Sequence, residues 1–196
     1  MRYGFTFLAL ALLPSLGSAA IKTETITYKV GDKSYKGFLA YDDASKEKRP
    51  GVLVVHEFWG LDDYAKKRAE QLAGMGYVAF CPDMYGEGKL TEHPKEAAKM
   101  AAEVRMNGAE WLARANAGLK ILRDNPLVDS KKLAGIGYCF GGSTVLTLAN
   151  SGSDVAAVVS FHGAIPIPEE ADAKKIKTRI LICHGAADSF IKEDTI

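Results

Sequence analysis

The sequence lacks the paired C-x-x-C motif of thiol-redox proteins, and it has few cysteines. The three cysteines stand at positions 81, 139 and 183, and an odd number leaves at least one thiol free in an oxidising compartment. Cys81 and Cys183 each end an apolar, β-like run, so we expect both to be small buried side chains rather than a disulfide pair. These features make a thiol-redox function the weakest interpretation of the chain.

An excess of charge of one sign is also missing, as are internal repeats and low-complexity tracts. Lys and Arg together number 25 and Asp and Glu together number 24, so no bulk field attracts nucleic acid or an anionic membrane. We expect neither of these partners. The chain also has no interdomain linker and is expected to contain a single folded domain.

Apolar runs long enough to cross a bilayer are absent, but a short one lies near the N-terminus. Residues 5–13 are mostly apolar and stand between a positively charged start and a group of small residues. This order is typical of a secretory signal peptide, with an uncleaved anchor as the alternative. We therefore expect a signal peptide at residues 1–20 and a periplasmic or secreted domain at residues 21–196, without stable membrane association.

The remaining pattern alternates between strands and helices. Residues 24–30 and 35–41 alternate apolar and polar side chains around a turn, which predicts an antiparallel hairpin. Helical spacing marks residues 62–75 and 94–124, with an expected break at Asn107. Continuous apolar runs, typical of strands buried on both faces, lie at residues 52–56, 77–81, 133–137, 155–161 and 179–183. The sequence thus predicts an α/β fold with a mostly parallel central sheet flanked by helices.

A nucleophile-like residue stands between one of these strands and a helical stretch. The segment Gly137-Tyr138-Cys139-Phe140-Gly141-Gly142 reads as Gly-x-nucleophile-x-Gly, the nucleophile elbow of the α/β-hydrolase fold, with Cys in place of Ser. A helix N-terminus favours thiolate over thiol, so the pattern predicts a reactive sulfur. A buried cysteine at a helix start is the alternative interpretation.

Other reactive side chains also lie near the carboxyl ends of predicted strands. Glu57, His162 and Asp188, like Cys139, fall just after the ends of predicted strands, and the carboxyl ends of parallel strands meet at one edge of the sheet. The backbone N–H of Phe140 is the expected first oxyanion donor, and a second donor is expected from the loop after the first buried strand. We choose the N–H of Phe58 for that second donor.

Four segments together resemble the dienelactone hydrolase family: residues 56–61 (HEFWGL), 82–86 (PDMYG), 137–142 (GYCFGG) and 184–188 (HGAAD). The resemblance begins near Ile26. It implies hydrolysis of esters or lactones by a Cys–His–Asp triad without a metal or other cofactor. It further implies that Asp188 is the triad acid and that Glu57 contacts Cys139 and helps to hold and ionise it. A helix-capping role is the alternative for Glu57, and a turn or cap role is the alternative for Asp188.

The sequence indicates the substrate-binding residues less clearly than the catalytic residues. We expect Tyr85, Trp59 and Tyr138, with Lys89, to line the mouth of the pocket. The best-known members of the family hold a substrate carboxylate with arginines, but no arginine follows Tyr85 in this chain. A generic small ester or lactone is therefore the expected substrate.

The histidine of the triad is the exception to the resemblance. In the family it lies after one further strand, whereas none of the four histidines here follows Asp188. We therefore expect a C-terminally incomplete member, without the last strand and helix and with residues 179–183 as an exposed sheet edge. His56 belongs to the segment that is expected to supply an oxyanion donor. We expect His93 to be a surface residue and His184 to make a structural hydrogen bond. His162 is a weak candidate to replace the missing base.

Two functions remain open from the sequence. The first is a cysteine-dependent hydrolase of small esters or lactones that acts through a thioester acyl-enzyme. The second is an exported protein that keeps the fold but is catalytically impaired or inactive, because the triad histidine is absent.

Overall fold

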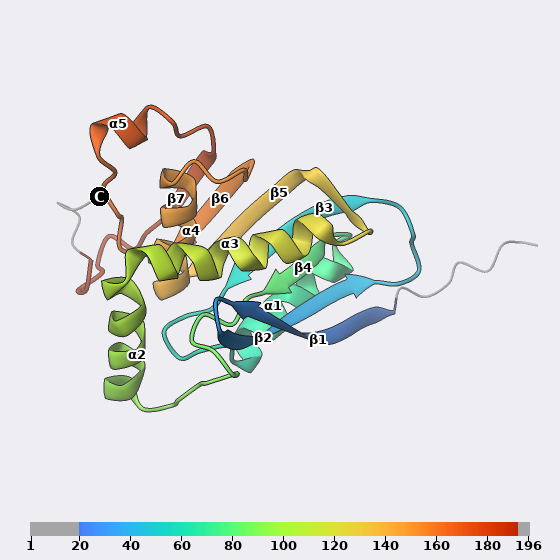
Figure 1. Cartoon of the computed structure of the whole chain (residues 1–196), viewed down its shortest axis with the longest axis horizontal. Coiled ribbons are helices and arrows are strands. Elements are labelled where there is room, and N and C mark those ends of the chain that lie inside the picture. Colours follow the sequence, from blue (N-terminus) through green and yellow to red (C-terminus); the bar gives the residue numbers. More distant parts are fainter. Residues whose placement is uncertain (1–19, 192–196) are drawn as a thin grey trace, which may run out of the picture.

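The computed structural model describes residues 20–191. The predicted signal peptide therefore lies outside the described residues, apart from Ala20. A seven-stranded sheet with the order β1-β2-β4-β3-β5-β6-β7 forms the centre of the described part (Figure 1). Its strands are β1 (Ile21–Val30), β2 (Lys33–Asp42), β3 (Arg49–Val55), β4 (Val78–Cys81), β5 (Val128–Tyr138), β6 (Ala157–Phe161) and β7 (Arg179–Cys183).

The N-terminal strands are antiparallel and the others are parallel. β1 and β2 form the predicted hairpin, and β2 joins the rest of the sheet through antiparallel pairing with β4. The strands from β4 through β3, β5 and β6 to β7 pair in parallel. The predicted α/β-hydrolase architecture, a mostly parallel sheet with an N-terminal hairpin, is confirmed.

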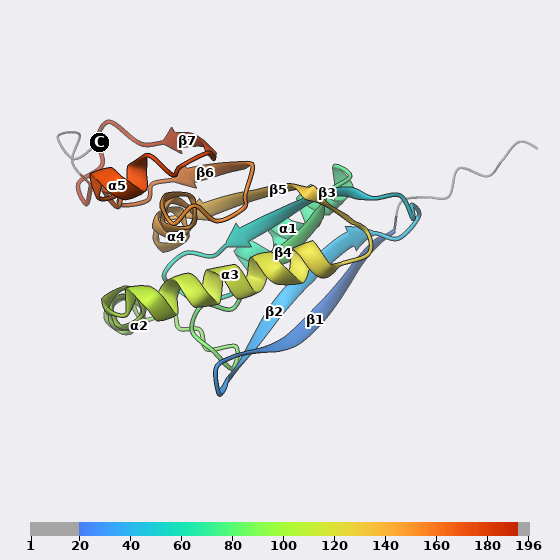
Figure 2. The same ribbon diagram turned by 45° about the horizontal axis from the view of Figure 1, so that its top comes forward.

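Helices cover both faces of the sheet. The helices are α1 (Asp63–Gly74), α2 (Pro94–Met106), α3 (Gly108–Asp124), α4 (Phe140–Asn150) and the short α5 (Glu170–Ala173). α1 lies on one face, and α3 and α4 lie on the other (Figures 1 and 2). α1 buries Ala65, Ala69 and Ala73, which recur every four residues and so form one stripe of small side chains that lets the helix approach the sheet closely.

The helix boundaries follow local capping. Asp62 accepts a hydrogen bond from the N–H of Ala65 and so begins α1 one residue later than the pattern predicted. The predicted break at Asn107 is confirmed, because α2 ends at Met106 and the Asn107 side chain caps α3 by accepting from the N–H of Glu110. The short helix α5 was not predicted, and β5 begins five residues before the predicted strand.

The cysteine predictions are confirmed for Cys81 and in part for Cys183. All three cysteines carry free thiols; Cys81 is fully buried and Cys183 is only half-buried. Cys81 ends β4 and Cys183 ends β7, and three strands separate these two in the sheet. That separation excludes a disulfide between them.

Strand β7 stands at one end of the sheet within residues 20–191. It pairs with β6 alone, and Ile180 and Leu181 expose 41% and 55% of their surface. The predicted exposed edge is thus present in the described part of the chain.

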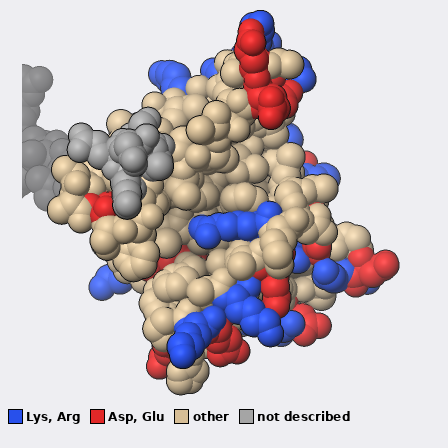
Figure 3. Space-filling model, turned by 90° about the vertical axis from the view of Figure 1, so that its left-hand side faces the viewer, with Lys and Arg blue, Asp and Glu red and all other residues tan. Residues whose placement is uncertain are grey.

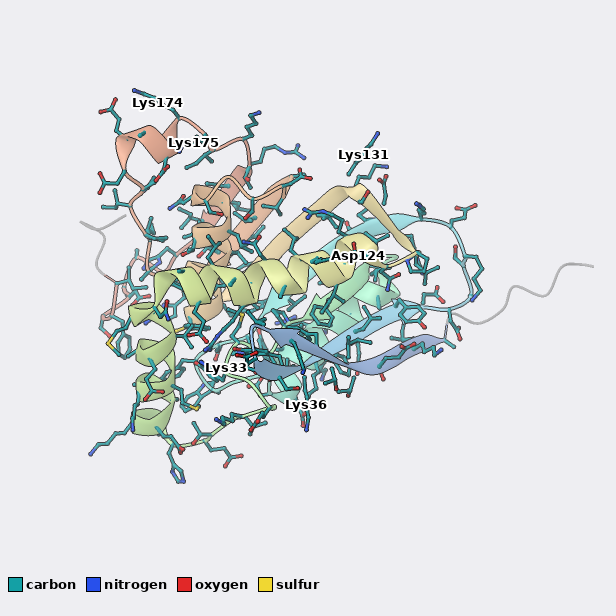
Figure 4. The ribbon with its side chains drawn as sticks, viewed as in Figure 1. Lys33, Lys36, Asp124, Lys131, Lys174 and Lys175 are labelled. Carbon is teal, nitrogen blue, oxygen red and sulfur yellow. The ribbon has the colours of Figure 1, made fainter. Side chains whose placement is uncertain are left out.

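Charged side chains are spread around the periphery. Lys33 at the hairpin, Lys131 in β5 and Lys174 beside α5 lie far apart in Figure 4. Several of these lysines are paired, as Lys33 is with Glu110 and Lys174 with Glu170. This distribution matches the near balance of charge in the sequence. No helix among residues 20–191 is long and apolar enough to cross a membrane.

Candidate active site

The nucleophile elbow is present at the carboxyl end of β5. Cys139 follows that strand, precedes the first residue of α4 and has a φ of 51°, in the left-handed region that a side chain adopts at a cost. A Cβ on Gly137 would lie 2.0 Å from the Gly141 carbonyl oxygen, and one on Gly141 would lie 2.2 Å from that of Val55. Glycine is required at both places because backbone atoms occupy the space of a side chain.

The Cys139 sulfur lies at this turn, half-buried. The N–H of Phe140 lies close enough to the sulfur to act on the pKa of the thiol, which is the position expected for one oxyanion donor. Burial has the largest effect on the Cys139 thiol and raises its pKa, and the negative charges of Glu57 and Asp188 raise it further. The Phe140 N–H and the positive charge of Arg105 lower the pKa. The net result is a pKa above the usual value for cysteine. The prediction of a lowered pKa is therefore wrong, because burial and two carboxylates outweigh the helix N-terminus.

Glu57 follows β3 and is half-buried, close enough for its charge to act on Cys139 and on Tyr138. Among the described residues no hydrogen bond joins Glu57 to Cys139, so the charge of Glu57 opposes the thiolate and does not promote it. The capping alternative for Glu57 is also wrong, because Asp62 caps α1.

His56 fixes the peptide that carries the second expected oxyanion donor. Its fully buried ring contacts the Glu57 carbonyl oxygen through Nδ1, while Nε2 accepts from the N–H of Met84 at 3.3 Å. A carbonyl accepts and an amide donates, so Nδ1 carries the proton, and burial lowers the pKa of the ring. The Glu57 carbonyl and the Phe58 N–H belong to one peptide unit, so a neutral His56 orients that N–H.

Tyr85 ties the same loop to the nucleophile's helix. Its hydroxyl donates to the Phe58 carbonyl oxygen at 2.9 Å, and its ring lies 5.6 Å from the Phe140 ring and 5.2 Å from the His56 ring. Phe140 is fully buried and also stacks on Trp111 at 5.9 Å. Tyr85 was predicted to line the mouth of the pocket, and its hydroxyl is instead hydrogen-bonded to the loop that carries the second expected oxyanion donor.

The other expected substrate contacts are divided between different surfaces. Trp59 lines a groove of about 510 Å³ together with Asp62, Asp63, Tyr64, Leu90, Thr91 and Glu92. Lys89 and Tyr85 line a separate cavity of about 290 Å³. Tyr138 packs on Phe161 and Tyr64, at 5.0 and 5.6 Å between ring centroids, and lines neither. The structure therefore does not gather the predicted substrate residues into one pocket.

Asp188 holds a histidine at the same edge of the sheet. Its side chain is 5% exposed; Oδ1 accepts from the N–H groups of Phe190 and Ile191, at 2.8 and 3.0 Å, and Oδ2 bonds to Nδ1 of His162. Burial alone would raise the pKa of this carboxyl, but those N–H groups and His162 outweigh it and the pKa is lowered. One oxygen thus shapes the turn, and the other is left to orient an imidazole.

His162, predicted to be only a weak substitute for the base, is the histidine that Asp188 contacts. It follows β6 with a left-handed φ of 57°, and its side chain is 45% exposed. Because Nδ1 contacts Asp188, Nε2 remains available. The feature of the sequence that could have identified His162 is its position directly after a predicted strand. That strand, β6, pairs in parallel with β5, so His162 lies at the same edge of the sheet as Cys139.

The remaining histidines occupy the expected places. His184 Nε2 hydrogen-bonds to the Ile191 carbonyl oxygen at 3.0 Å and lies 3.3 Å from Asp188 Oδ2, in keeping with the predicted structural role. His93 is exposed just before α2. Within residues 20–191 no group of three or more His, Cys, Asp or Glu side chains is arranged to hold a metal ion.

Figure 3 looks onto this end of the molecule. A hollow near its centre is surrounded mainly by uncharged side chains, a basic side chain lies across it, and acidic side chains lie mostly at the margins. The strained cysteine, the fixed oxyanion loop and the Asp188–imidazole contact together form a candidate site for acyl transfer.

Comparison with known proteins agrees with this arrangement. The model of the dienelactone hydrolase family matches residues 35–196. The chain belongs to the dienelactone hydrolase family. The structure called m3DLH is 39% identical, has a TM-score of 0.85, and the match covers 90% of this chain and 73% of that one.

Curated relatives are less similar in sequence. Protein usf of Aquifex pyrophilus is 29% identical over 180 residues, which cover 88% of this chain and 75% of that protein. Carboxymethylenebutenolidase of Pseudomonas putida is 24% identical over 175 residues, which cover 86% of this chain and 73% of that enzyme.

Proposed function

We propose that this dienelactone hydrolase family member hydrolyses small esters or lactones, with Cys139 as the nucleophile. Membership of a hydrolase family supports the reaction class, and relatives named carboxymethylenebutenolidase support a lactone or ester substrate. The observation that carries the proposal is the strained Cys139, which is held in a glycine-flanked elbow at the start of α4.

The raised pKa of Cys139 sets the first step. A thiol is a poor nucleophile, so its proton must pass to a base as the sulfur attacks. We assign this base to His162, because Asp188 holds its Nδ1 and leaves Nε2 to accept a proton. Asp188 then stabilises the imidazolium that forms.

The acyl transfer follows from these positions. The sulfur bonds to the ester carbonyl carbon, and the N–H groups of Phe58 and Phe140 stabilise the oxyanion. The bond to the leaving oxygen breaks, and that oxygen takes the proton from the imidazolium. Water then gives a proton to the imidazole and attacks the thioester carbon; the carbon–sulfur bond breaks, and the sulfur recovers its proton.

Turnover of 4-nitrophenyl acetate by the full chain tests this function. We expect sustained release of nitrophenol, loss of activity in Cys139→Ala, and an acetyl group on Cys139 by mass spectrometry after rapid quenching. Cys183→Ala is the matched control, since Cys183 also ends a strand at this edge but has no elbow. Equal rates for the wild type and Cys139→Ala would exclude the cysteine mechanism.

We also propose that the domain is exported. The charged start, apolar stretch and small residues of positions 1–20 support a cleaved signal peptide. Expression in a Gram-negative host should place the mature protein in the periplasmic fraction, with its N-terminal sequence beginning near residue 21. A full-length chain in the cytoplasmic fraction would contradict export.

A further inference from the structure

Asp83 is a fully buried aspartate in the loop that follows β4. Its Oδ1 atom accepts hydrogen bonds from the N–H groups of Tyr85 and Gly86, at 2.9 and 2.8 Å. Its Oδ2 atom accepts from the N–H groups of Gly88 and Lys36, at 2.8 and 3.1 Å. Among the described residues no side chain donates to this carboxylate, so four main-chain N–H dipoles stabilise its buried charge.

The loop around Asp83 has a strained backbone. Gly86, Glu87 and Gly88 have φ values of 96°, 56° and 72°, in the left-handed region that favours glycine. A run of residues with such φ values is costly, above all at Glu87, and it persists only where other contacts hold it. The N–H groups on either side of Glu87, those of Gly86 and Gly88, both donate to Asp83. The carboxylate therefore fixes the path of the loop over residues 83–88.

The two residues after Asp83 hold the peptide of the second expected oxyanion donor. Met84 donates its N–H to Nε2 of His56 at 3.3 Å, and the Tyr85 hydroxyl donates to the Phe58 carbonyl oxygen at 2.9 Å. The Nδ1 atom of His56 contacts the carbonyl oxygen of the peptide unit whose N–H belongs to Phe58. Both supports of Phe58 thus begin beside Asp83, whose carboxylate also binds the Tyr85 N–H. Any shift of the loop would move them together.

The N-terminal hairpin holds Asp83 and its loop from the other side. The hydroxyl of Tyr28 in β1 donates to the Asp83 carbonyl oxygen at 3.2 Å. The Glu87 N–H donates to the Ser34 carbonyl oxygen of β2 at 3.0 Å. Asp83 is thus the point at which the hairpin, the loop after β4 and the loop after β3 are connected.

We propose that Asp83 is a positioning residue of the active site, which sets the direction of the Phe58 N–H through Met84 and Tyr85. The inference rests on the proposed hydrolase function, in which that N–H stabilises the oxyanion. Such a donor acts on charge that develops in the transition state, so a small displacement should lower kcat and leave KM nearly unchanged. The sequence could not reveal this role, because the loops after β3 and β4 meet only in the folded chain.

The tautomer of His56 reports on the loop without any turnover. Because Nε2 accepts from the Met84 N–H and burial lowers the pKa of the ring, neutral His56 carries its proton on Nδ1 near neutral pH. Asp83→Asn, in either orientation of the amide, places an NH2 group where two backbone N–H groups now donate, so the loop should lose its present path. In a ¹⁵N NMR spectrum of histidine-labelled protein, we expect the His56 nitrogens to change from one tautomer to a mixture of both. The His56 signals are assigned by their loss in His56→Gln.

Ester hydrolysis then measures the effect on catalysis. Rates are expressed per active site, counted by alkylation of Cys139, so that a loss of folded protein does not lower kcat. We expect Asp83→Asn to lower kcat about thirtyfold and to change KM less than about twofold, as for the misplacement of one oxyanion donor. Tyr85→Phe, which removes only the hydrogen bond to Phe58, should lower kcat about tenfold. The double variant should match Asp83→Asn within about twofold, because both residues act on one peptide, whereas independent effects would multiply to about 300-fold.

Asp129→Asn is the matched control, and Gly86→Ala is a second variant of the loop. Asp129 also accepts from a backbone N–H, that of Lys131 at 3.1 Å, but at the amino end of β5, so its loss should change neither kcat nor the His56 spectrum. If circular dichroism shows that Asp83→Asn does not fold, Gly86→Ala, which places a side chain at a φ of 96°, should give the same changes. Wild-type kcat with an unchanged His56 tautomer in the folded variant overturns the proposal, as does an equal fall in Asp129→Asn. A changed tautomer in Asp83→Asn without ester turnover by the wild type would refute the hydrolase function and keep the positioning of the loop.

Discussion

Asp188 contacts the imidazole of His162 with one carboxylate oxygen and two backbone N–H groups with the other. Asp188→Asn separates these two functions. The Asn oxygen can still accept from the turn, but its amide nitrogen donates to His162 and imposes the wrong tautomer. We expect kcat to fall by about 10³-fold or more, as it does when the aspartate of another catalytic triad is replaced by asparagine. The temperature of thermal unfolding should change little.

The matched variant for that prediction is His162→Gln, which removes the base and keeps a polar side chain. It should lower kcat to a similar extent, and the double variant should be no worse than either single one, because the two residues act as a unit. Steady-state ester hydrolysis measures all three. Wild-type turnover in His162→Gln would show that this histidine is not the base.

Glu57 provides a test of the charge balance at the sulfur. Burial raises the pKa of Cys139 and the Glu57 carboxylate raises it further, so Glu57→Gln should lower that pKa and speed alkylation by iodoacetamide near neutral pH. For the wild type, the rate should keep rising with pH beyond the inflection of an unperturbed cysteine. A slower rate in Glu57→Gln would instead support the prediction from the sequence that Glu57 ionises the thiol.

Gly141 and Gly74 form a matched pair for the elbow. A Cβ on Gly141 would lie 2.2 Å from the Val55 carbonyl oxygen, whereas one on Gly74 at the end of α1 meets nothing within 4 Å. Gly141→Ala should destabilise the protein by about 3 kcal/mol or more through overpacking against backbone. Gly74→Ala should stabilise it by about 0.5–1 kcal/mol. Urea unfolding measures both, and equal stabilities would contradict the close approach.

Glu110 links the hairpin to α3 and predicts sensitivity to acid. Hydrogen bonds from Arg114 and Lys33 lower its pKa from 4.5 to about 2. A lowered folded-state pKa stabilises the protein fully above the unfolded value, and this stabilisation is lost as the pH falls from 4.5 toward about 2. Glu110→Gln should therefore unfold more easily at pH 7 and show a weaker dependence on pH in that window.

Glu103→Gln is the control for the acid experiment. Glu103 is an exposed carboxylate of α2 whose partner Lys99 lies 3.9 Å away, so its loss should change neither the stability at pH 7 nor the acid dependence. Thermal unfolding between pH 2 and pH 7 compares the two variants. Identical profiles for Glu110→Gln and the wild type would contradict the stabilising role.

Much of the site follows from local sequence. The tight strand–helix turn at Cys139 requires Gly137 and Gly141, because a side chain at either position would collide with neighbouring backbone atoms. The same reasoning placed Glu57, His162 and Asp188 at one edge, since parallel strands bring their carboxyl ends together. These are consequences of short-range geometry and strand direction, which the order of residues alone specifies.

The tertiary structure decided the balance of charge and the contacts between distant elements. The pKa of Cys139 depends on burial and on Glu57, Asp188 and Arg105, which three separate segments bring to it, so no local motif predicts its sign. The engagement of the Tyr85 hydroxyl by Phe58 likewise required both loops in place. Electrostatic and packing energies depend on distances through space, whereas a motif records only neighbours along the chain.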